Sequence, residues 1–178
     1  MRYQSFFFYR KLKSILRIRA VKYALEIAFI LLVFFSVKAY MQRHLVEGTA
    51  PALQATLLNG QSVNLQSSTD KPVLLHFWAT WCPVCKLEQN SINAISEDHK
   101  VITVAMNSGS DLEVQAYLEE NNLSFPVIID EDSNIAKRFG VHGVPTSFII
   151  NPRGTIDFTE VGYTTSWGLR FRLWLAEE

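Results

Sequence analysis

Both cysteines of the chain lie within the five residues 81–85 (Trp-Cys-Pro-Val-Cys), and this spacing constrains the fold more than any other feature of the sequence. A nearly continuous apolar run over residues 73–78 precedes the pair and is typical of a buried strand. A helix is expected from Pro83 to about Glu97, because proline at the first helical position removes no hydrogen bond. The spacing therefore predicts a strand that leads directly into a helix, with Cys82 at the helix N-terminus.

This position gives the cysteine pair its chemistry. The unpaired backbone N–H groups and the positive end of the helix dipole stabilise a thiolate at Cys82 and lower its pKa from the free value of ~8.5. Cys85 lies one turn deeper, close enough to close a disulfide and shielded from large substrates. The pair can therefore attack a disulfide through Cys82 and release the resulting mixed disulfide through Cys85.

Two other uses of a cysteine pair fit the sequence less well. A structural disulfide between Cys82 and Cys85 would close so short a loop that it constrains little of the unfolded chain. A metal site would need further ligands, and the four scattered histidines do not complete one. Redox chemistry is the preferred interpretation, and no metal or cofactor is expected.

The first 41 residues differ sharply in charge from the rest of the chain. They carry eight Lys and Arg residues against Glu26 alone, a net charge of +7, whereas residues 42–178 carry a net charge of −7. The stretch from Tyr23 to Met41 is mostly apolar and is flanked by tyrosines, which favour membrane interfaces. The pattern predicts a basic cytoplasmic leader over residues 1–22 and a transmembrane anchor over residues 23–41.

Because the basic residues precede the apolar segment, the positive-inside rule places the N-terminus in the cytoplasm and the later residues outside it. The alternative is a cleaved signal peptide, since residues 37–39 resemble a small-residue cleavage site. The long basic leader and the absence of a clear polar break favour retention of the segment. The acidic second part argues against a nucleic-acid surface, and a hydrophobic content of 48% excludes a disordered chain.

The remaining residues form a short linker over 42–50 and one globular domain over 51–178. Strands alternate with helices, which predicts an α/β sheet, and two hairpin signals, Asn59-Gly60 and residues 151–154, add antiparallel pairs. Asp111 is expected to cap one helix and Gly140 to close another. The expected strands are 53–58, 62–65, 73–78, 101–106, 125–129, 146–150 and 155–161, and the expected helices are 83–97, 111–121, 133–139 and 167–176.

Residues 76–86 (His-Phe-Trp-Ala-Thr-Trp-Cys-Pro-Val-Cys-Lys) and 143–148 (Gly-Val-Pro-Thr-Ser-Phe) together resemble the thioredoxin family. The resemblance covers residues 50–176 and is closest to the membrane-anchored periplasmic branch, which includes cytochrome c maturation reductases and suppressor-of-copper-sensitivity thioredoxins. It implies a thioredoxin fold, with a central mixed sheet flanked by helices, an N-terminal β-hairpin and a helix–strand insertion over residues 110–130.

The same resemblance implies a cis peptide between Val144 and Pro145, packed against the cysteines. A cis bond there would expose the Val144 backbone so that the extended chain of a substrate can pair with it. Pro145 is accordingly a candidate catalytic-site residue. The substrate-binding surface is expected to comprise Trp81, Pro83, Val84, Val144 and Pro145.

Glu88 is the third candidate catalytic residue beside the two cysteines. On the predicted helix it shares a face with Val84, Cys85, Ile92 and Ile95, so its carboxyl should point toward the core and have a raised pKa. In the cytochrome-maturation branch a glutamate at the matching place carries protons. The proline that commonly follows that glutamate is absent here, and Gln89-Asn90 stand in its place.

His76 lies six residues before Cys82, at the strand position where thioredoxin has a buried acid. A neutral imidazole there could relay a proton to or from Cys85, and a buried histidine without a catalytic role is the alternative. The spacing of the last large apolar residues predicts core packing for the final helix. These residues are Trp167, Phe171, Trp174 and Leu175.

The leading hypothesis is a single-pass inner-membrane thiol–disulfide oxidoreductase with a periplasmic catalytic domain. The Pro-Val pair between the cysteines supplies no histidine to hold the Cys82 thiolate, which favours a reductase of protein disulfides. The expected partners are oxidised proteins, apocytochrome c or copper-stress proteins among them, and a membrane electron donor. The alternatives are a disulfide oxidase and a copper-binding chaperone that uses the same cysteines. A thiol peroxidase is disfavoured because Cys82 does not lie in a Pro/Thr-flanked loop ahead of the helix.

Overall fold

A computed structural model of the chain describes residues 3–66 and 70–177, with side chains from residue 21 onward. The chain divides after Arg43 into two compact units. The first is almost entirely helix α1 (Tyr3–Gln42), whose segment Val21–Gln42 is long and apolar enough to cross a membrane and is not buried inside the protein. The predicted leader and the predicted anchor therefore belong to one continuous helix.

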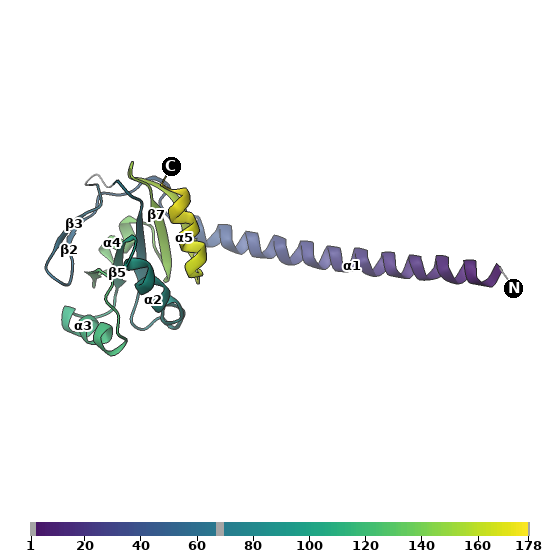
Figure 1. The fold of residues 1–178 in the computed structure, drawn as a ribbon, viewed down its shortest axis with the longest axis horizontal. Coiled ribbons are helices and arrows are strands. Elements are labelled where there is room, and N and C mark those ends of the chain that lie inside the picture. The colour runs from purple at the N-terminus through teal and green to yellow at the C-terminus, as the bar shows by residue number, and fades with distance from the viewer. Residues whose placement is uncertain (1–2, 67–69, 178) are drawn as a thin grey trace. The chain divides into compact units, whose positions relative to one another are not determined.

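The second unit contains a six-stranded mixed sheet in the order β1-β8-β7-β4-β5-β6 (Figure 1). The three strands β4, β5 and β6 run parallel, whereas β7 is antiparallel to β4 and β8 is antiparallel to β7 and β1. Their bounds are β1 (Gly48–Thr49), β4 (Val73–Trp78), β5 (Lys100–Met106), β6 (Val127–Asp130), β7 (Thr146–Ile150) and β8 (Thr155–Val161).

A separate hairpin lies between β1 and β4 in the chain, as the Asn59-Gly60 dipeptide predicts. Strand β2 (Gln54–Thr56) pairs with β3 (Ser62–Asn64) in antiparallel register. Gly60 has φ +83° in the turn, a conformation that glycine adopts without strain. The side chain of Asn59 stabilises the turn by accepting the Gln61 N–H at 3.0 Å.

Among the described residues, four helices complete the second unit: α2 (Pro83–Ser96), α3 (Asp111–Glu120), α4 (Asn134–Arg138) and α5 (Ser166–Leu175). Together with β6, α3 forms the helix–strand insertion that the thioredoxin resemblance implies. Gly140 ends α4 with φ +69°, and any side chain there would collide with the carbonyl group of His44. The predicted thioredoxin fold is confirmed.

The sheet separates two hydrophobic cores, and strand β4 contributes to both because its side chains alternate between the faces. Leu74 and Trp78 belong to the core that contains the buried residues of α2 and α5. Leu75 and Phe77 belong to the core formed with α4 and the N-terminal hairpin. His76 is in phase with Leu74 and Trp78, so its imidazole faces α2.

Two boundary predictions need correction. Asp111 is not the cap of α3: Ser110 holds that position, and its backbone N–H donates to the Glu113 carboxylate at 2.8 Å in a capping box. The predicted linker over residues 42–50 is shorter than expected, because Gly48 and Thr49 pair with Ile156 and Thr155 as strand β1.

The expectation for the final helix is wrong. The outward-facing residues of α5 are 85% exposed at Trp167, 59% at Phe171, 58% at Trp174 and 37% at Leu175. The core is filled instead by Leu169 and Leu173, which are fully buried. Both sets of residues recur at helical spacing, so the periodicity predicts the helix correctly but does not determine which of its two apolar faces packs on the sheet.

Candidate functional site

The two cysteines form a disulfide at the N-terminus of α2, with their Cα atoms 5.3 Å apart. Cys82 is the N-cap residue in extended conformation, and Pro83 occupies the first helical position, as the sequence predicts. The Cys85 N–H donates to Cys82 Sγ at 3.1 Å. The sulfur of Cys82 therefore already accepts one of the helix N–H groups that would stabilise its thiolate.

The loop between β4 and α2 is held by a hydrogen bond within itself and by one to the loop that follows β5. The Cys82 N–H donates to the Ala79 carbonyl at 3.2 Å, and the Thr80 N–H donates to Ser108 Oγ at 3.1 Å. In this disulfide state both cysteines are only 3% exposed. The two cysteines thus differ in their position on the helix and not in their exposure, which corrects the expectation that only Cys85 is shielded.

A cis peptide joins Val144 and Pro145 immediately before β7, as the thioredoxin resemblance implies. The Val144 carbonyl oxygen lies 3.6 Å from Cys82 Sγ, so this loop faces the reactive sulfur. The Pro145 carbonyl accepts the Gly162 N–H at 2.9 Å, and Thr146 Oγ1 donates to the Gly143 carbonyl at 2.8 Å. Because these groups are engaged with one another, the loop is fixed against the disulfide.

Apolar side chains surround the disulfide on the protein surface. Trp81 is 58% exposed, and its indole N–H donates to the Asn107 carbonyl at 2.9 Å, which holds the ring in place. Val84 is 38% exposed and Pro83 is also exposed. Leu87, which sequence reasoning does not single out, is 73% exposed one turn further along α2.

Glu88 is buried in the middle of α2, as its four apolar neighbours predict. Its carboxyl group is 1% exposed, and Oε2 accepts the Thr164 N–H at 3.0 Å. Burial raises the pKa of Glu88 from its ordinary value of 4.5 to about 7, although the hydrogen bond from Thr164 opposes part of this rise. At neutral pH this carboxyl group can therefore both accept and donate a proton.

His76 lies opposite Glu88 on β4. Its Nε2 is 3.6 Å from Glu88 Oε1, and its Nδ1 is 2.9 Å from the hydroxyl of Ser147. Burial lowers the pKa of His76 from 6.5 to about 3, so the ring is neutral at pH 7. The histidine is uncharged and the carboxyl is partly protonated at pH 7. The two side chains therefore form a polar contact and not a salt bridge.

Two members of this buried network have little or no signal in the sequence. Ser147 pairs directly with His76 across β7 and β4, a register that only the folded sheet reveals. Thr164 contributes its backbone N–H, which is independent of its side chain, and it comes from a loop 76 residues away from Glu88. Ser147 does fall within the 143–148 motif, which is the one available hint.

Within the part of the chain that the structure describes, no group of three or more His, Cys, Asp or Glu side chains could hold a metal ion. The arrangement of the site is instead that of a reversible dithiol. It has a disulfide at a helix N-terminus, a fixed loop opposite the outer sulfur and a buried proton-exchanging group one turn along the helix. Such a site can exchange electrons with another disulfide.

Comparison with known proteins gives consistent matches. The model of the AhpC/TSA family matches residues 46–159. A thioredoxin-like protein of Haemophilus influenzae is 31% identical over 161 residues, which cover 89% of this chain and 96% of that protein. Sporulation thiol-disulfide oxidoreductase A of Bacillus subtilis is 30% identical over 135 residues, which cover 70% of this chain and 81% of that protein. The crystal structure of StoA from Bacillus subtilis matches with a TM-score of 0.59 at 27% identity, covering 69% of this chain and 97% of that one.

Proposed function

The chain belongs to the AhpC/TSA family and is a thioredoxin-like thiol–disulfide oxidoreductase, and on this premise we propose that it reduces disulfides of extracytoplasmic proteins while α1 anchors it in the membrane. The observation that carries the proposal is the Cys82–Cys85 disulfide at the N-terminus of α2, facing the loop of Val144 and Pro145. This geometry provides an attacking sulfur, a resolving sulfur and a backbone edge for the substrate.

The reaction starts from the dithiol form. The Cys82 thiolate attacks one sulfur of a substrate disulfide, which forms a mixed disulfide and releases the other substrate sulfur as a thiolate. The Cys85 thiolate then attacks Cys82 Sγ, so that the second substrate sulfur leaves and the Cys82–Cys85 disulfide forms. The substrate gains two electrons and the enzyme loses two, and a membrane electron-donor protein must supply the next pair.

Substrate binding relies on the exposed apolar side chains and on the backbone next to the disulfide. Trp81, Pro83 and Val84 offer contact area, and Val144 lies at the end of the fixed loop beside Cys82. An extended substrate segment can pair with the backbone there, as peptides do at exposed strand edges. Recognition through main-chain groups accommodates different sequences around the target disulfide.

Glu88 can exchange a proton with the resolving cysteine, Cys85. It lies one turn after Cys85 on the buried face of α2, and its raised pKa allows it to hold a proton near neutral pH. When the enzyme's own disulfide is reduced, Cys85 leaves as a thiolate and Glu88 can protonate it. His76 Nε2, on the other side of Glu88 Oε1, is positioned to relay this proton, with Ser147 holding its Nδ1.

The direction of electron flow follows from the two residues between the cysteines. Neither Pro83 nor Val84 carries a charge or a side-chain donor to stabilise the Cys82 thiolate, and a less stabilised thiolate makes the dithiol a better reductant. The test is the reduction potential of the purified protein against glutathione. A value as high as the ~−120 mV of strong oxidants would overturn the reductase assignment in favour of a disulfide oxidase.

A copper-binding module is the second candidate for the same cysteines, since soft thiolates bind Cu(I). Titration of the reduced protein with Cu(I) separates the two. A reductase should turn over protein disulfides catalytically, and tight stoichiometric copper binding without disulfide exchange would overturn this function. The two substrate classes to compare in such assays are oxidised apocytochrome c and oxidised copper-stress proteins.

Membrane anchoring explains the long apolar segment and the charge difference across it. We place the N-terminus in the cytoplasm and the catalytic domain in the periplasm, because the basic residues of the chain's first part precede the span. A reporter fused after Glu178 should be active only outside the cytoplasm, and detergent should be needed to release the protein. Release of a soluble form that begins near Tyr40 would show instead that the segment is a cleaved signal peptide.

A further inference from the structure

Helix α5 has two apolar faces, and only one of them is used by the fold. Leu169, Leu173 and Ala176 face the sheet and are at most 2% exposed. The opposite side, here called the outer face of α5, is formed by residues that recur at positions i, i+4, i+7 and i+8 and are 37% to 85% exposed: Trp167, Phe171, Trp174 and Leu175. A second apolar face that stays exposed on a packed helix is a candidate contact surface.

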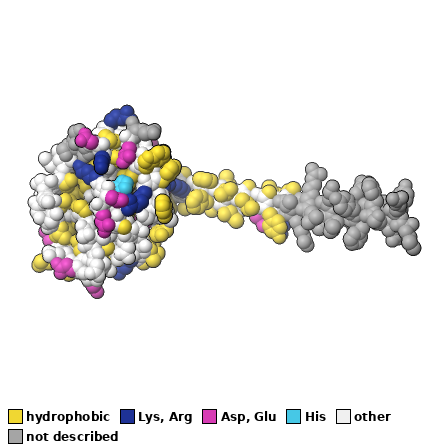
Figure 2. Space-filling model, in the orientation of Figure 1, with side chains coloured by type: hydrophobic (Ala, Val, Ile, Leu, Met, Phe, Trp, Pro, Cys, Tyr) yellow, Lys and Arg dark blue, Asp and Glu magenta, His cyan; other side chains and the backbone are white. Residues whose placement is uncertain are grey.

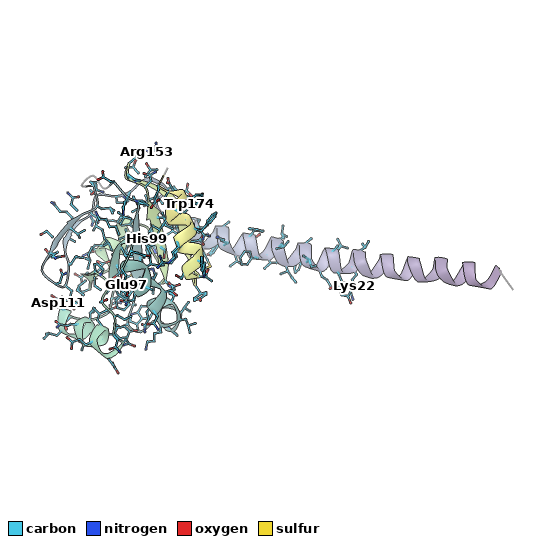
Figure 3. All side chains as sticks on the ribbon, in the orientation of Figure 1. Lys22, Glu97, His99, Asp111, Arg153 and Trp174 are labelled. Atoms are coloured by element: carbon cyan, nitrogen blue, oxygen red, sulfur yellow. A yellow bond between two sulfur atoms is a disulfide. The ribbon has the colours of Figure 1, made fainter. Side chains whose placement is uncertain are left out.

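The aromatic residues of the outer face lie next to one another on the helix. Phe171 and Trp174 stack on each other with their ring centroids 6.0 Å apart, so the aromatic residues form one patch. Figure 2 shows hydrophobic side chains gathered over the helix, and Figure 3 labels Trp174 upon it. A contiguous exposed apolar patch marks a surface that contacts something else.

The charges that flank the outer face are already neutralised within the domain. Arg170 Nη1 is 2.5 Å from Asp98, and Arg172 Nη2 is 2.7 Å from Glu160. Both arginines therefore form ion pairs with acids of the domain itself. The occupant of the face is consequently selected by its apolar and aromatic character and not by a strong charge.

The connection between α1 and the domain bears on the choice of that occupant. Strand β1 is where the chain enters the sheet, and it pairs with β8. Helix α5 is linked to the same strand, because Arg172 binds Glu160 of β8. The connection from α1 is itself fixed on the domain, because the Val46 N–H donates to the Phe139 carbonyl at 3.2 Å.

That connection is short. Only residues 43–47 separate the end of α1 at Gln42 from the start of β1 at Gly48. A fully extended chain covers at most ~3.6 Å per residue, so the tether reaches about 20 Å, less than the width of a domain of this size. The short connection therefore keeps the domain close to the surface of any membrane that α1 spans.

We propose that the outer face of α5 docks into the headgroup region of the bilayer that holds α1. Trp and Phe are among the residues that favour this region, where an aromatic ring meets both lipid and water. The proposal rests on the membrane anchoring proposed above. Docking orients the active site relative to the bilayer, because Thr164 at the start of the α5 region donates its N–H to Glu88 of α2.

Tryptophan fluorescence of the full chain in lipid vesicles tests the docking directly, because all four tryptophans belong to the second unit and none to α1. The chain is reconstituted into phosphatidylethanolamine–phosphatidylglycerol vesicles that contain a lipid with a nitroxide quencher near the headgroup. We expect the quencher to reduce the emission of Trp167 and Trp174 and to leave that of the buried Trp78 unchanged. Replacing Trp81 with Phe, away from α5, should leave the lipid-dependent quenching intact.

The matched variants alter the outer face without removing a reporter. Phe171→Ser combined with Leu175→Ser keeps all four tryptophans, and should abolish quenching by the lipid and increase quenching by aqueous acrylamide. Leu112→Ser, at a residue of α3 that is 78% exposed, is the control and should behave as wild type. Unchanged disulfide-reductase activity in detergent and unchanged circular dichroism verify that the variants are folded.

Three results would overturn the proposal. If the chain resists alkaline extraction from the vesicles while Trp167 and Trp174 are not quenched by the lipid, the anchor is correct and the docking is wrong. If alkaline washing removes the chain, the anchoring and the docking both fail. If the tryptophans become protected only as the protein-to-lipid ratio rises, a second copy of the chain covers the outer face.

Discussion

Helices α2 and α5 pack on the same face of the sheet, and each departs from the usual distribution of residues in the opposite sense. α2 buries the carboxyl group of Glu88, which is 1% exposed, among its apolar residues. α5 exposes Trp167 and Trp174, which are 85% and 58% exposed. Burying a carboxyl group costs free energy of folding, and an indole ring that stays exposed contributes little to that free energy.

The buried carboxyl of α2 and the exposed rings of α5 do not stabilise the fold, and we infer a separate use for each. The buried carboxyl of α2 gains a pKa of about 7, which makes it useful to thiol chemistry. The exposed rings of α5 gain nothing within the domain, so their use lies outside it. One departure therefore indicates a reaction and the other indicates an interface.

The largest effect is expected from substitution of the two cysteines at the start of α2. Cys85→Ser should accumulate mixed disulfides with substrate proteins on Cys82, because the resolving thiol is missing, whereas Cys82→Ser should accumulate none. Both variants should lose multiple-turnover disulfide reduction. Non-reducing electrophoresis followed by mass spectrometry of the trapped species measures the difference and also identifies the substrates. Equal trapping by the two variants would mean that the roles of the cysteines are misassigned.

The two faces of α5 should differ strongly in their contribution to stability. Leu169→Ala removes a fully buried side chain and should lower the free energy of unfolding by about 2–5 kcal/mol. Trp167→Ala, on the outer face, should change the free energy by no more than about 0.5 kcal/mol. Urea unfolding of both variants in detergent, followed by circular dichroism, provides the comparison. A loss at Trp167 as large as that at Leu169 would show that the outer face supports the fold itself.

The same two helices show what the sequence can and cannot predict. For α2 the prediction of a buried carboxyl is correct, because Glu88 shares one face of the helix with Cys85, Ile92 and Ile95, which are buried with it. For α5 the helix is predicted and its orientation is wrong, because a stripe of Leu169 and Leu173 competes with a stripe of larger aromatic residues. Periodicity cannot choose between two apolar faces, and residue size favours the wrong one.

Most of the fold and of the redox centre follows from local patterns. The strand before Cys82, the helix after it and the Asn59-Gly60 hairpin each depend on neighbours in the sequence, and all are confirmed. The contacts of Ser147 and Thr164 with His76 and Glu88 depend on sheet register and on a distant loop. Such contacts are set by tertiary structure and leave no periodic trace in the sequence.

Glu88 of α2 and His76 of β4, which are both buried, should control how the stability of the protein depends on pH. The folded-state pKa of Glu88 is raised from 4.5 to about 7, so its contribution to stability is fully present below pH 4.5 and is lost as the pH rises toward 7. The folded-state pKa of His76 is lowered from 6.5 to about 3, so its contribution increases as the pH rises from 3 to 6.5. Between pH 4.5 and 6.5 the two trends oppose each other.

Single substitutions should therefore reveal opposite slopes in the oxidised protein. Glu88→Gln leaves only the histidine trend, so stability should increase with pH by up to about 1.4 kcal/mol per pH unit between 4.5 and 6.5. His76→Asn leaves only the carboxyl trend, so stability should decrease over the same range. Urea unfolding at several pH values measures both slopes. Identical profiles for wild type and both variants would show that the two groups do not titrate differently in the folded and unfolded states.

The smallest expected effect is on the rate of disulfide exchange. Glu88→Gln preserves the shape of the side chain and its hydrogen bond from Thr164, but it removes the proton that the carboxyl group exchanges near neutral pH. It should slow reduction of the enzyme's disulfide about tenfold at pH 7, less than the ~10²-fold or more that a general acid typically contributes. It should also lower the apparent pKa of Cys85, because an ionised carboxylate one turn away no longer opposes the thiolate.

The control is Glu97→Gln, at the exposed C-cap of the same helix (Figure 3). This variant should match wild type in both rate and thiol titration, because Glu97 lies at the opposite end of α2 from the cysteines. The measurement is the rate of thiol alkylation as a function of pH in the reduced protein, together with the rate at which a small dithiol reduces the oxidised one. Titration curves for Glu88→Gln that coincide with wild type would separate the buried carboxyl from the cysteine chemistry, and Glu88 would then be an unusual core residue without a role in proton transfer.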